Sequence, residues 1–530
     1  MKLNKLPLLF VVFLITVSCK KEIEELPLES SIEISTPPPA PIFVVDNFKN
    51  VRQLGAKGDG QTDDSDILQS IINQNDTVVF DGGVYIINNS LKLKNGSRII
   101  GKNGATIKSG QNMKGTLMAF ARYFTISDVK GASVFGLTFQ PSNQNFNISK
   151  WLDACILVSN SVDVAITDNT FDFKLPYDIF GYEAIWVTGP KTNNTLIKGN
   201  KLYTVGIKYA ENGANGTIVE SNMIKDAHSN ALTANGNSST SKACKLLNNT
   251  IENSGRMAIE DWGAVDGTLM QGNVIIGCGK GSSQAADGMG ISAVGTNSFV
   301  INNKISDAKT YYLEVGGNHN ILAQDNIIID TEKKGTGIIL NYTGELPPNV
   351  TNSNSQLINN SISGCEKSIH IFGSAYAKCI VKGNKIIDPK DRGISIENFS
   401  VTNDIMISGN YFTINNPTSI PRILLNSNNN LAFGVSRQNV TIDDNHITYN
   451  RSASGGSGFD IGFLISSDRV NITNNEIIGN NNKSGGYDIL GLTCNGGTAT
   501  NLKIMKNKVS GTVVDLKGFL NSTISDNIFP

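Results

Sequence analysis

The sequence has little charge, little histidine and little tryptophan. Only 17% of its 530 residues are charged, and it contains 4 His and 3 Trp. Lys+Arg number 45 and Asp+Glu number 46, so no excess of one sign favours nucleic acid or an anionic membrane surface as a partner. The 52 glycines are typical of many short strands joined by tight turns, and they argue against a helical bundle.

Cysteines are few, and none of the seven forms a Cys-x-x-Cys pair or a Cys/His cluster, so a zinc site is not expected. Apart from Cys19, they adjoin mostly apolar residues and are interpreted as small buried hydrophobic residues. No cofactor motif is present. Calcium stays open as an alternative, although no array of aspartates has calcium-loop spacing.

Residues 1–18 have the pattern of an export signal. Lys2 and Lys5 precede an apolar run over residues 6–17, which is short for a membrane span. The tripeptide Val17-Ser18-Cys19 resembles a bacterial lipobox, and this resemblance implies cleavage before Cys19 and attachment of lipid to its thiol.

The residues after Cys19 indicate a tether. The acidic stretch at residues 22–25 resembles the surface-export signal of Bacteroidetes-type lipoproteins. Residues 19–45 include the proline-rich segment 36–41 and are expected to be extended, which leaves 46–530 as the folded domain. The expected location is the outer membrane, at the cell surface, held by the lipid on Cys19.

One short phrase recurs through the later part of the chain: asparagine, any residue, then an apolar residue, usually isoleucine. Fourteen copies lie between Asn169 and Asn527, at a mean spacing of about 27 residues, which is typical of a solenoid. The repeats contain β-branched alternation and turn residues but no long helical pattern, so each is predicted to be one coil of a parallel β-helix. The asparagines are expected to form an internal ladder between coils.

A second column of residues follows the asparagine phrase. A small residue, an apolar residue, a variable residue and another apolar residue recur, as in Ala184-Ile185-Trp186-Val187. Because side chains alternate along a strand, the variable residue is expected to point outward. The predicted exposed face therefore carries, coil by coil, Trp186, Lys208, Thr233, Glu260, Ser292, Glu314, Ile339 and His370.

The segment that begins at Val51 reads Val-Arg-Gln-Leu-Gly-Ala-Lys-Gly-Asp-Gly-Gln-Thr-Asp-Asp-Ser, and residues 67–72 then show helical apolar spacing. This segment resembles the N-terminal signature of the pectate-lyase-like superfamily, which includes rhamnogalacturonases, polygalacturonases, epimerase-like proteins and phage tailspikes. The resemblance implies an all-β fold: a right-handed single-stranded parallel β-helix with a short N-terminal capping helix, which Asp64 or Ser65 could N-cap. The catalytic motifs of the polygalacturonases and mannuronan epimerases are absent, so the resemblance implies the fold strongly and the chemistry weakly.

Polar residues converge on three successive coils. Glu260 and Glu314 share the outward column two coils apart, roughly 9.6 Å between backbones, and Asp287 lies on a turn between them. Such a pair suits glycoside hydrolysis, with the wide pair near the inverting separation and Glu260 with Asp287 nearer the retaining one. Asp261 is expected to point inward. Predicted substrate contacts are Trp262, Arg256, Tyr312, His228, Lys208, Trp186, His319 and His370, with Glu183 and Arg392 on the same side.

Three functions stay open at this stage. The first is a glycoside hydrolase with Glu260 and Glu314, or Asp287, as the carboxylate pair. The second is a polysaccharide lyase, which needs a base such as Lys208, His228 or Tyr312, and Arg256 or calcium to neutralise a uronate carboxylate. The third is a non-catalytic carbohydrate-binding surface protein. In each case the predicted partner is a polysaccharide, and no nucleic acid is expected.

Overall fold

The structure is a computed structural model, and it describes a defined part of the chain. The described residues are 49–110, 113, 122–141, 153–178, 181–234, 240–262, 265–283, 287–316, 320–341, 354–372, 375–397, 401–415, 423–426, 437–451, 463–465, 470–481, 487–491, 493–494, 497–500, 503–510, 513–515, 519–520 and 523–528. One compact unit spans Phe48–Pro530. Cys19 and the predicted signal and tether, over residues 1–45, lie outside the described residues.

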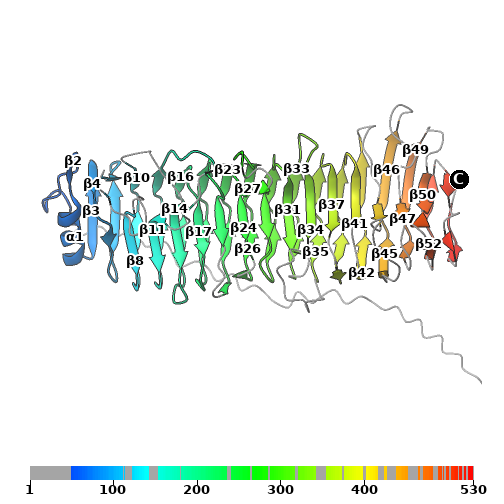
Figure 1. Cartoon of the computed structure of the whole chain (residues 1–530), viewed down its shortest axis with the longest axis horizontal. Coiled ribbons are helices and arrows are strands. Elements are labelled where there is room, and N and C mark those ends of the chain that lie inside the picture. Colours follow the sequence, from blue (N-terminus) through cyan, green and yellow to red (C-terminus); the bar gives the residue numbers. More distant parts are fainter. Residues whose placement is uncertain are drawn as a thin grey trace, which may run out of the picture. The chain divides into compact units, whose positions relative to one another are not determined.

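Within this unit, strands stack side by side into three long parallel sheets, here named A, B and C (Figure 1). A typical coil places one short strand in each sheet: β22 (Lys245–Leu247) in A, β23 (Thr250–Ser254) in B and β24 (Ile259–Asp261) in C. Consecutive coils pair in parallel, as β23 does with β27 (Val274–Cys278). The predicted right-handed parallel β-helix is confirmed.

Sheet C carries the outward column predicted from the sequence. Its strands, in order along the stack, are β5 Leu91–Lys92, β8 Phe124–Ser127, β11 Asp153–Ser159, β14 Tyr182–Thr188, β17 Ile207–Ala210, β20 Leu232–Ala234, β24 Ile259–Asp261, β28 Ile291–Ala293, β31 Tyr311–Gly316, β34 Thr336–Asn341, β37 Lys367–Phe372, β41 Arg392–Glu397, β44 Ile423–Asn426, β47 Phe463–Ile465, β50 Tyr487–Gly491 and β55 Val513–Asp515. Beside the middle of this sheet, A contributes β15 Leu196–Lys198, β18 Ile218–Glu220, β22, β26 Leu269–Gln271 and β29 Phe299–Ile301, and B contributes β16 Lys201–Tyr203, β19 Met223–Lys225, β23, β27 and β30 Lys304–Ser306.

The asparagine phrase forms the turn between sheets A and B. The first thirteen of the fourteen asparagines each donate from Nδ2 to Oδ1 of the next one along the stack, at 2.8–3.1 Å, and the ladder ends at Asn527. The residue before every ladder asparagine has positive φ, as at Asn248 (φ 53°) and Gly272 (φ 68°). Asp, Asn or Gly fills this position in all copies except those at Ser221 and Lys506, because these residues tolerate the left-handed conformation best.

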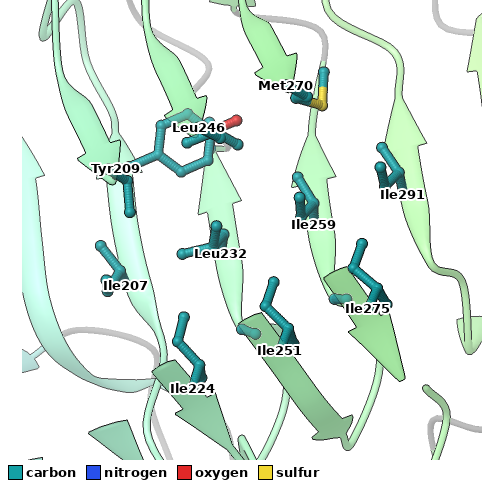
Figure 2. Packing of buried hydrophobic residues seen from close by; sticks show 14 of the residues in the cluster. Ile207, Tyr209, Ile224, Leu232, Leu246, Ile251, Ile259, Met270, Ile275 and Ile291 are labelled. Atoms are coloured by element: carbon teal, nitrogen blue, oxygen red, sulfur yellow. The ribbon is translucent and has the colours of Figure 1, made fainter. Parts of the chain in front are cut away.

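The core is a set of stacked apolar columns. In Figure 2, Ile207, Leu232, Ile259 and Ile291 lie in line from sheet C, and Ile224, Ile251 and Ile275 face them from sheet B. All are fully buried. Leu246 and Met270 from sheet A close the third side. Burial of one side chain of this size stabilises the folded state by roughly 1.5–3 kcal/mol relative to leaving it exposed. Each column therefore helps to hold consecutive coils together.

The helix α1 (Ser65–Gln74) lies at the first end of the stack and contacts β3 (Thr77–Asp81) and β5 (Figure 1). Leu68, Ile71 and Ile72 are its buried apolar residues. Asp64 occupies the N-cap position, but its carboxylate accepts from the backbone N–H groups of Lys57 (2.7 Å) and Gly58 (2.9 Å) and makes no side-chain cap bond. The prediction of a side-chain cap by Asp64 or Ser65 is therefore wrong, and Asp63 instead accepts the Ser65 N–H.

No helix among the described residues is long and apolar enough to cross a membrane.

Candidate functional site

The outward column of sheet C has the register that the sequence predicts. Strand pairing joins Trp186 to Lys208, Lys208 to Thr233 and Thr233 to Glu260. It then continues through Ser292, Glu314, Ile339 and His370. Glu260 and Glu314 are thus two coils apart with Ser292 between them, as expected.

The prediction that this whole face is exposed is wrong. Glu260 is 4% exposed and Glu314 is 3% exposed, and the other members from Thr233 to His370 are also buried. Strand alternation fixes the direction of a side chain, whereas its exposure depends on what the neighbouring bends lay over it. Here Asn230 and Arg256, from the bends before β20 and β24, turn toward Glu260 and bind it.

Three donors hold the Glu260 carboxylate. Asn230 Nδ2 and Thr233 Oγ1 both donate to Oε2 at 2.7 Å. Arg256 Nη1 donates to Oε1 at 3.0 Å. A guanidinium and two neutral donors together hold this buried carboxylate in one orientation.

Arg256 also connects Glu260 to Asp287. Its Nε lies 3.2 Å from Asp287 Oδ2, and the Asp287 side chain is 50% exposed. One guanidinium therefore holds a buried and a solvent-facing carboxylate side by side. The predicted grouping of Arg256, Glu260 and Asp287 is found in the structure.

Glu314 has its own neutral partners. Ser292 Oγ donates to its Oε2 at 2.5 Å, and Asn341 Nδ2 donates to its Oε1 at 3.2 Å. No cation among the described residues forms an ion pair with it. The Glu260 and Glu314 carboxylates thus share one face but differ in partners, because Arg256 contacts only Glu260.

Trp186 and Lys208 form the next part of the site toward the N-terminus. Lys208 Nζ lies 4.8 Å from the centroid of the Trp186 ring, and Glu211 accepts from Trp186 Nε1 at 2.6 Å. Lys208 Nζ is 3.5 Å from the same glutamate. Glu211 was not singled out in the sequence, because it follows β17 and lies outside the repeating column.

Glu183 is the second residue of β14 (Tyr182–Thr188). Its Oε2 is buried and has no hydrogen-bond partner. The residue as a whole keeps part of its surface exposed. Burial raises the pKa of Glu183 to about 7, and the negative charge of Glu260 adds to this rise while Lys208 and the Gly206 N–H oppose it. Glu183 is therefore largely protonated in mildly acidic conditions.

Asp261 points inward beneath Glu260, as its strand position predicts. It accepts hydrogen bonds from Tyr209 (2.8 Å), Thr268 (3.0 Å) and Ser298 (2.9 Å). Burial raises the pKa of Asp261 to about 6. This closed network fixes the end of β24, and Trp262, which follows it, is half-buried.

Two predicted substrate contacts lie inside the protein. His228 is fully buried, its Nδ1 lies 2.8 Å from the Thr204 carbonyl oxygen and its Nε2 has no partner. Tyr312 is 1% exposed and belongs to the apolar core, where burial raises the pKa of its hydroxyl and the charge of Asp330 raises it further. His228 lies at a bend, where the alternation of a strand no longer fixes the direction of a side chain, whereas Tyr312 lies within β31 and is nevertheless covered.

The remaining predicted residues are farther along the column or undescribed. His370 is buried three coils beyond Ser292 and packs against Phe372 at 5.4 Å between ring centroids. Arg392 Nε is 3.1 Å from Asp391. His319 lies outside the described residues.

The structure adds partners that sequence reasoning missed: Asn230, Asn341 and Glu211. Their signal in the sequence is weak, since they are ordinary polar residues at bends or strand ends, and only the stacking of coils brings them to Glu260, Glu314 and Trp186. Within the described part of the chain, no three His, Cys, Asp or Glu residues are arranged to hold a metal ion.

Comparisons with known proteins agree with this architecture. A family model described as "Rhamnogalacturonase A/epimerase, pectate lyase-like" matches residues 48–283. A second, described as "Right handed beta helix region", matches residues 239–412.

Similar curated proteins match only short segments. The "Non-secreted LysM effector LysM19" of Penicillium expansum is 47% identical over 57 residues, which are 10% of this chain and 4% of that protein. The "Probable glucan endo-1,3-beta-glucosidase" of Arthroderma benhamiae is 37% identical over 60 residues, which are 11% of this chain and 7% of that protein. The chain therefore spans a small part of the length of these relatives.

Two solved structures illustrate the structural similarity. The surface adhesin PfbA of Streptococcus pneumoniae has 16% identity and a TM-score of 0.44, with 70% of this chain and 93% of that chain covered. An exopolygalacturonase of Thermotoga maritima has 11% identity and a TM-score of 0.38, with 83% and 93% covered. The two family models, over residues 48–283 and 239–412, confirm the predicted resemblance of this chain to the pectate-lyase-like right-handed β-helix superfamily.

Proposed function

We propose that this protein cleaves glycosidic bonds in a polysaccharide, with Glu260 as the central carboxylate of the site. The matched family is named for rhamnogalacturonase, epimerase and pectate-lyase-like proteins, and this supports a polysaccharide as the substrate. The observation that carries the proposal is the placement of Glu260, Asp287 and Glu314 on one face of three successive coils, with Arg256 between the first two.

In this proposal Glu260 takes the proton of the attacking water. Arg256, Asn230 and Thr233 all donate to it, which stabilises the anion and fixes its direction. Glu314, two strands away, has the wide separation that leaves room for a water, while Asp287 on the same guanidinium is the closer partner. Because Glu260 is nearly sealed, we expect either Asn230 or Arg256 to release it when a glycan binds, while the other donors keep its direction.

The charge of the site supports a hydrolase over a lyase. Among the described residues around the column, the carboxylates Glu211, Glu260, Asp287 and Glu314 outnumber the cations Lys208 and Arg256, even without Glu183. A lyase needs positive charge to neutralise a uronate, whereas this surplus of acids repels one. We therefore expect a neutral polysaccharide.

The test is to incubate the purified chain with neutral and uronate-containing polysaccharides, and to measure new reducing ends together with the ultraviolet absorbance of unsaturated uronates. New reducing ends without absorbance, lost in Glu260→Gln, are the expected result. Absorbance would instead identify a lyase. No cleavage of any glycan, with binding retained in Glu260→Gln, would identify a carbohydrate-binding protein.

We further propose that the chain is an exported lipoprotein anchored in the outer membrane and displayed at the cell surface. The proposal rests on the charged and apolar pattern of residues 1–18 and on Cys19. Mass spectrometry of the N-terminal peptide from cells tests it. A diacylglyceryl group on Cys19, absent in Cys19→Ala, is expected, and an intact residue 1 or an unmodified Cys19 would contradict it.

A further inference from the structure

We infer that Glu183 is the proton donor of this site, giving its carboxylic acid hydrogen to the oxygen of the glycosidic bond. This inference rests on the proposed hydrolase function and assigns the second half of its chemistry. Sequence reasoning placed Glu183 only among the flanking residues, and paired Glu260 with Glu314 or Asp287 as its acid/base partner.

The first observation is the position of Glu183 relative to Glu260. Strand register places Gly206 on the coil after Glu183 and Ala231 on the coil after that, and Asn230, next to Ala231, donates to Glu260. A Cβ built on Gly206 would lie 2.9 Å from Glu183 Oε2 and 2.4 Å from the Asn230 carbonyl oxygen. The two glutamates are therefore separated by one glycine and one asparagine, and they interact electrostatically.

The second observation is that backbone closes the space around Glu183 Oε2. At Gly206 even a methyl group would collide with this oxygen and with the next coil, and Oε2 has no hydrogen-bond partner. Ionisation of a carboxyl in such a place is costly even with the Gly206 N–H facing it, whereas a protonated carboxyl keeps a hydrogen that it can give away. The partial exposure of the residue leaves a route toward a bound glycan.

The third observation is the set of charges that faces Glu183. From β17, Lys208 approaches it, but this ammonium is also 3.5 Å from Glu211 and lies over the Trp186 ring. From β24, the negative charge of Glu260 opposes ionisation of Glu183, and Arg256 is already bound to Glu260 and Asp287. On the other side, β11 places Ala154 opposite Glu183, and the neighbouring Asp153 is paired with Arg122 at 2.8 Å.

These environments separate the two glutamates into an acid and a base, which is the division that glycoside hydrolysis needs. Glu183 protonates the bridging oxygen as the bond from that oxygen to the anomeric carbon breaks, and the leaving sugar departs with a hydroxyl group. A water oxygen bonds to the anomeric carbon and its proton passes to Glu260. Exchange with solvent then returns one proton to Glu183 and removes one from Glu260, so no other reactant is required.

The experiment compares Glu183→Gln, Glu314→Gln and Asp287→Asn on the polysaccharide that the wild type cleaves, with Glu252→Gln on the outer face of sheet B as the matched control. We expect kcat/KM of the wild type and of the control to fall as the pH rises through about 7, because Glu183 then loses its proton. Glu183→Gln should lose this fall and reduce cleavage about 10²- to 10⁴-fold. On a dinitrophenyl glycoside of the same sugar, whose leaving group needs no proton, it should stay near the wild-type rate.

Several results would overturn the inference. Retention of the fall near pH 7 in Glu183→Gln, or its loss in Glu314→Gln or Asp287→Asn instead, would assign the proton donor elsewhere. An equal loss on both substrates would indicate a structural role. Cleavage that requires Glu260 but not Glu183 would overturn this inference alone, whereas no cleavage by the wild type would overturn the proposed function as well.

A second measurement does not depend on activity. Infrared difference spectra of the wild type against Glu183→Gln should contain the C=O stretching band of a protonated carboxyl at pH 6, and this band should disappear as the pH rises past 7. A carboxyl already ionised at pH 6 would contradict the assignment of Glu183 as the acid.

Discussion

Arg256 Nη1 donates to Glu260 Oε1 at 3.0 Å, and the two side chains of this ion pair are 23% and 5% exposed. Because the same guanidinium holds Asp287, its removal leaves one buried and one half-exposed carboxylate without their cation. Removing one partner of a buried pair is costly, since the other charge stays out of water without compensation.

We therefore expect Arg256→Ala to lower the free energy of local opening of the coils around β24 by about 3 kcal/mol. We also expect it to abolish any glycan cleavage. Arg98→Ala, an exposed arginine of β6 (Arg98–Lys102), is the matched control and should have little effect. Hydrogen exchange of the β20 and β24 amides measures the change. Equal exchange in Arg256→Ala and Arg98→Ala would show that Glu260 is stable without its cation.

The asparagine ladder predicts a localised loss of stability in Asn249→Ala. Asn249 Nδ2 donates to Asn273 Oδ1 and to the Val219 carbonyl oxygen, and its Oδ1 accepts from both nitrogens of Asn222. The substitution leaves these buried groups without partners, at a cost of about 1–3 kcal/mol each. Because a solenoid need not unfold as one unit, hydrogen exchange resolved by coil is the right measurement.

Faster exchange should centre on β19, β23 and β27 and fade with distance along the stack. Asn73→Ala, in the exposed part of α1, serves as the control for an asparagine outside the ladder. Uniform destabilisation of all coils would contradict the nearest-neighbour picture.

The sequence predicted the ladder and the outward column but not the environment of the site. Asn169 and its thirteen successors were recognisable because one buried polar group per coil must recur in phase. Exposure of Glu260 was mispredicted because Asn230, 30 residues away, covers it, and nothing in the repeat determines where a bend residue turns. The burial of Glu183 Oε2 likewise depends on its close approach to Gly206 in the next coil. The sequence alone does not reveal this contact, because it follows from the register of the stacked coils.

Residues 174–178 form a segment, here called the strap, that the repeat pattern of the sequence does not predict. It leaves β13 (Thr170–Asp172) and runs across several coils, since Tyr177 donates to Asp226 at 3.2 Å and the Asp178 N–H donates to the His228 carbonyl oxygen at 3.3 Å. Asp178 then accepts from the N–H and hydroxyl groups of Ser282 and Ser283 at 2.8–3.1 Å, more than 100 residues away.

We expect Asp178→Ala to release this strap, with a loss of about 1–2 kcal/mol in the free energy of local opening. Hydrogen exchange over residues 174–178 and 226–228 measures it. A double-mutant cycle with Ser283→Ala isolates the Asp178–Ser283 interaction. A coupling energy near zero would show that this interaction contributes nothing to the stability of the strap.

The burial of His228 predicts acid sensitivity. Burial lowers the pKa of His228 from 6.5 to about 4, although the bond to the Thr204 carbonyl opposes the shift. Between these pH values the unfolded chain binds a proton that the folded chain does not, so stability from this residue is complete above pH 6.5 and is lost as the pH falls to about 4, by roughly 3 kcal/mol. In His228→Asn, whose amide can donate to Thr204 as Nδ1 does, this part of the pH dependence should disappear. Coil-resolved hydrogen exchange at pH 7 and pH 5 measures it, and an equal loss of protection in both proteins would mean that groups other than His228 determine the acid response.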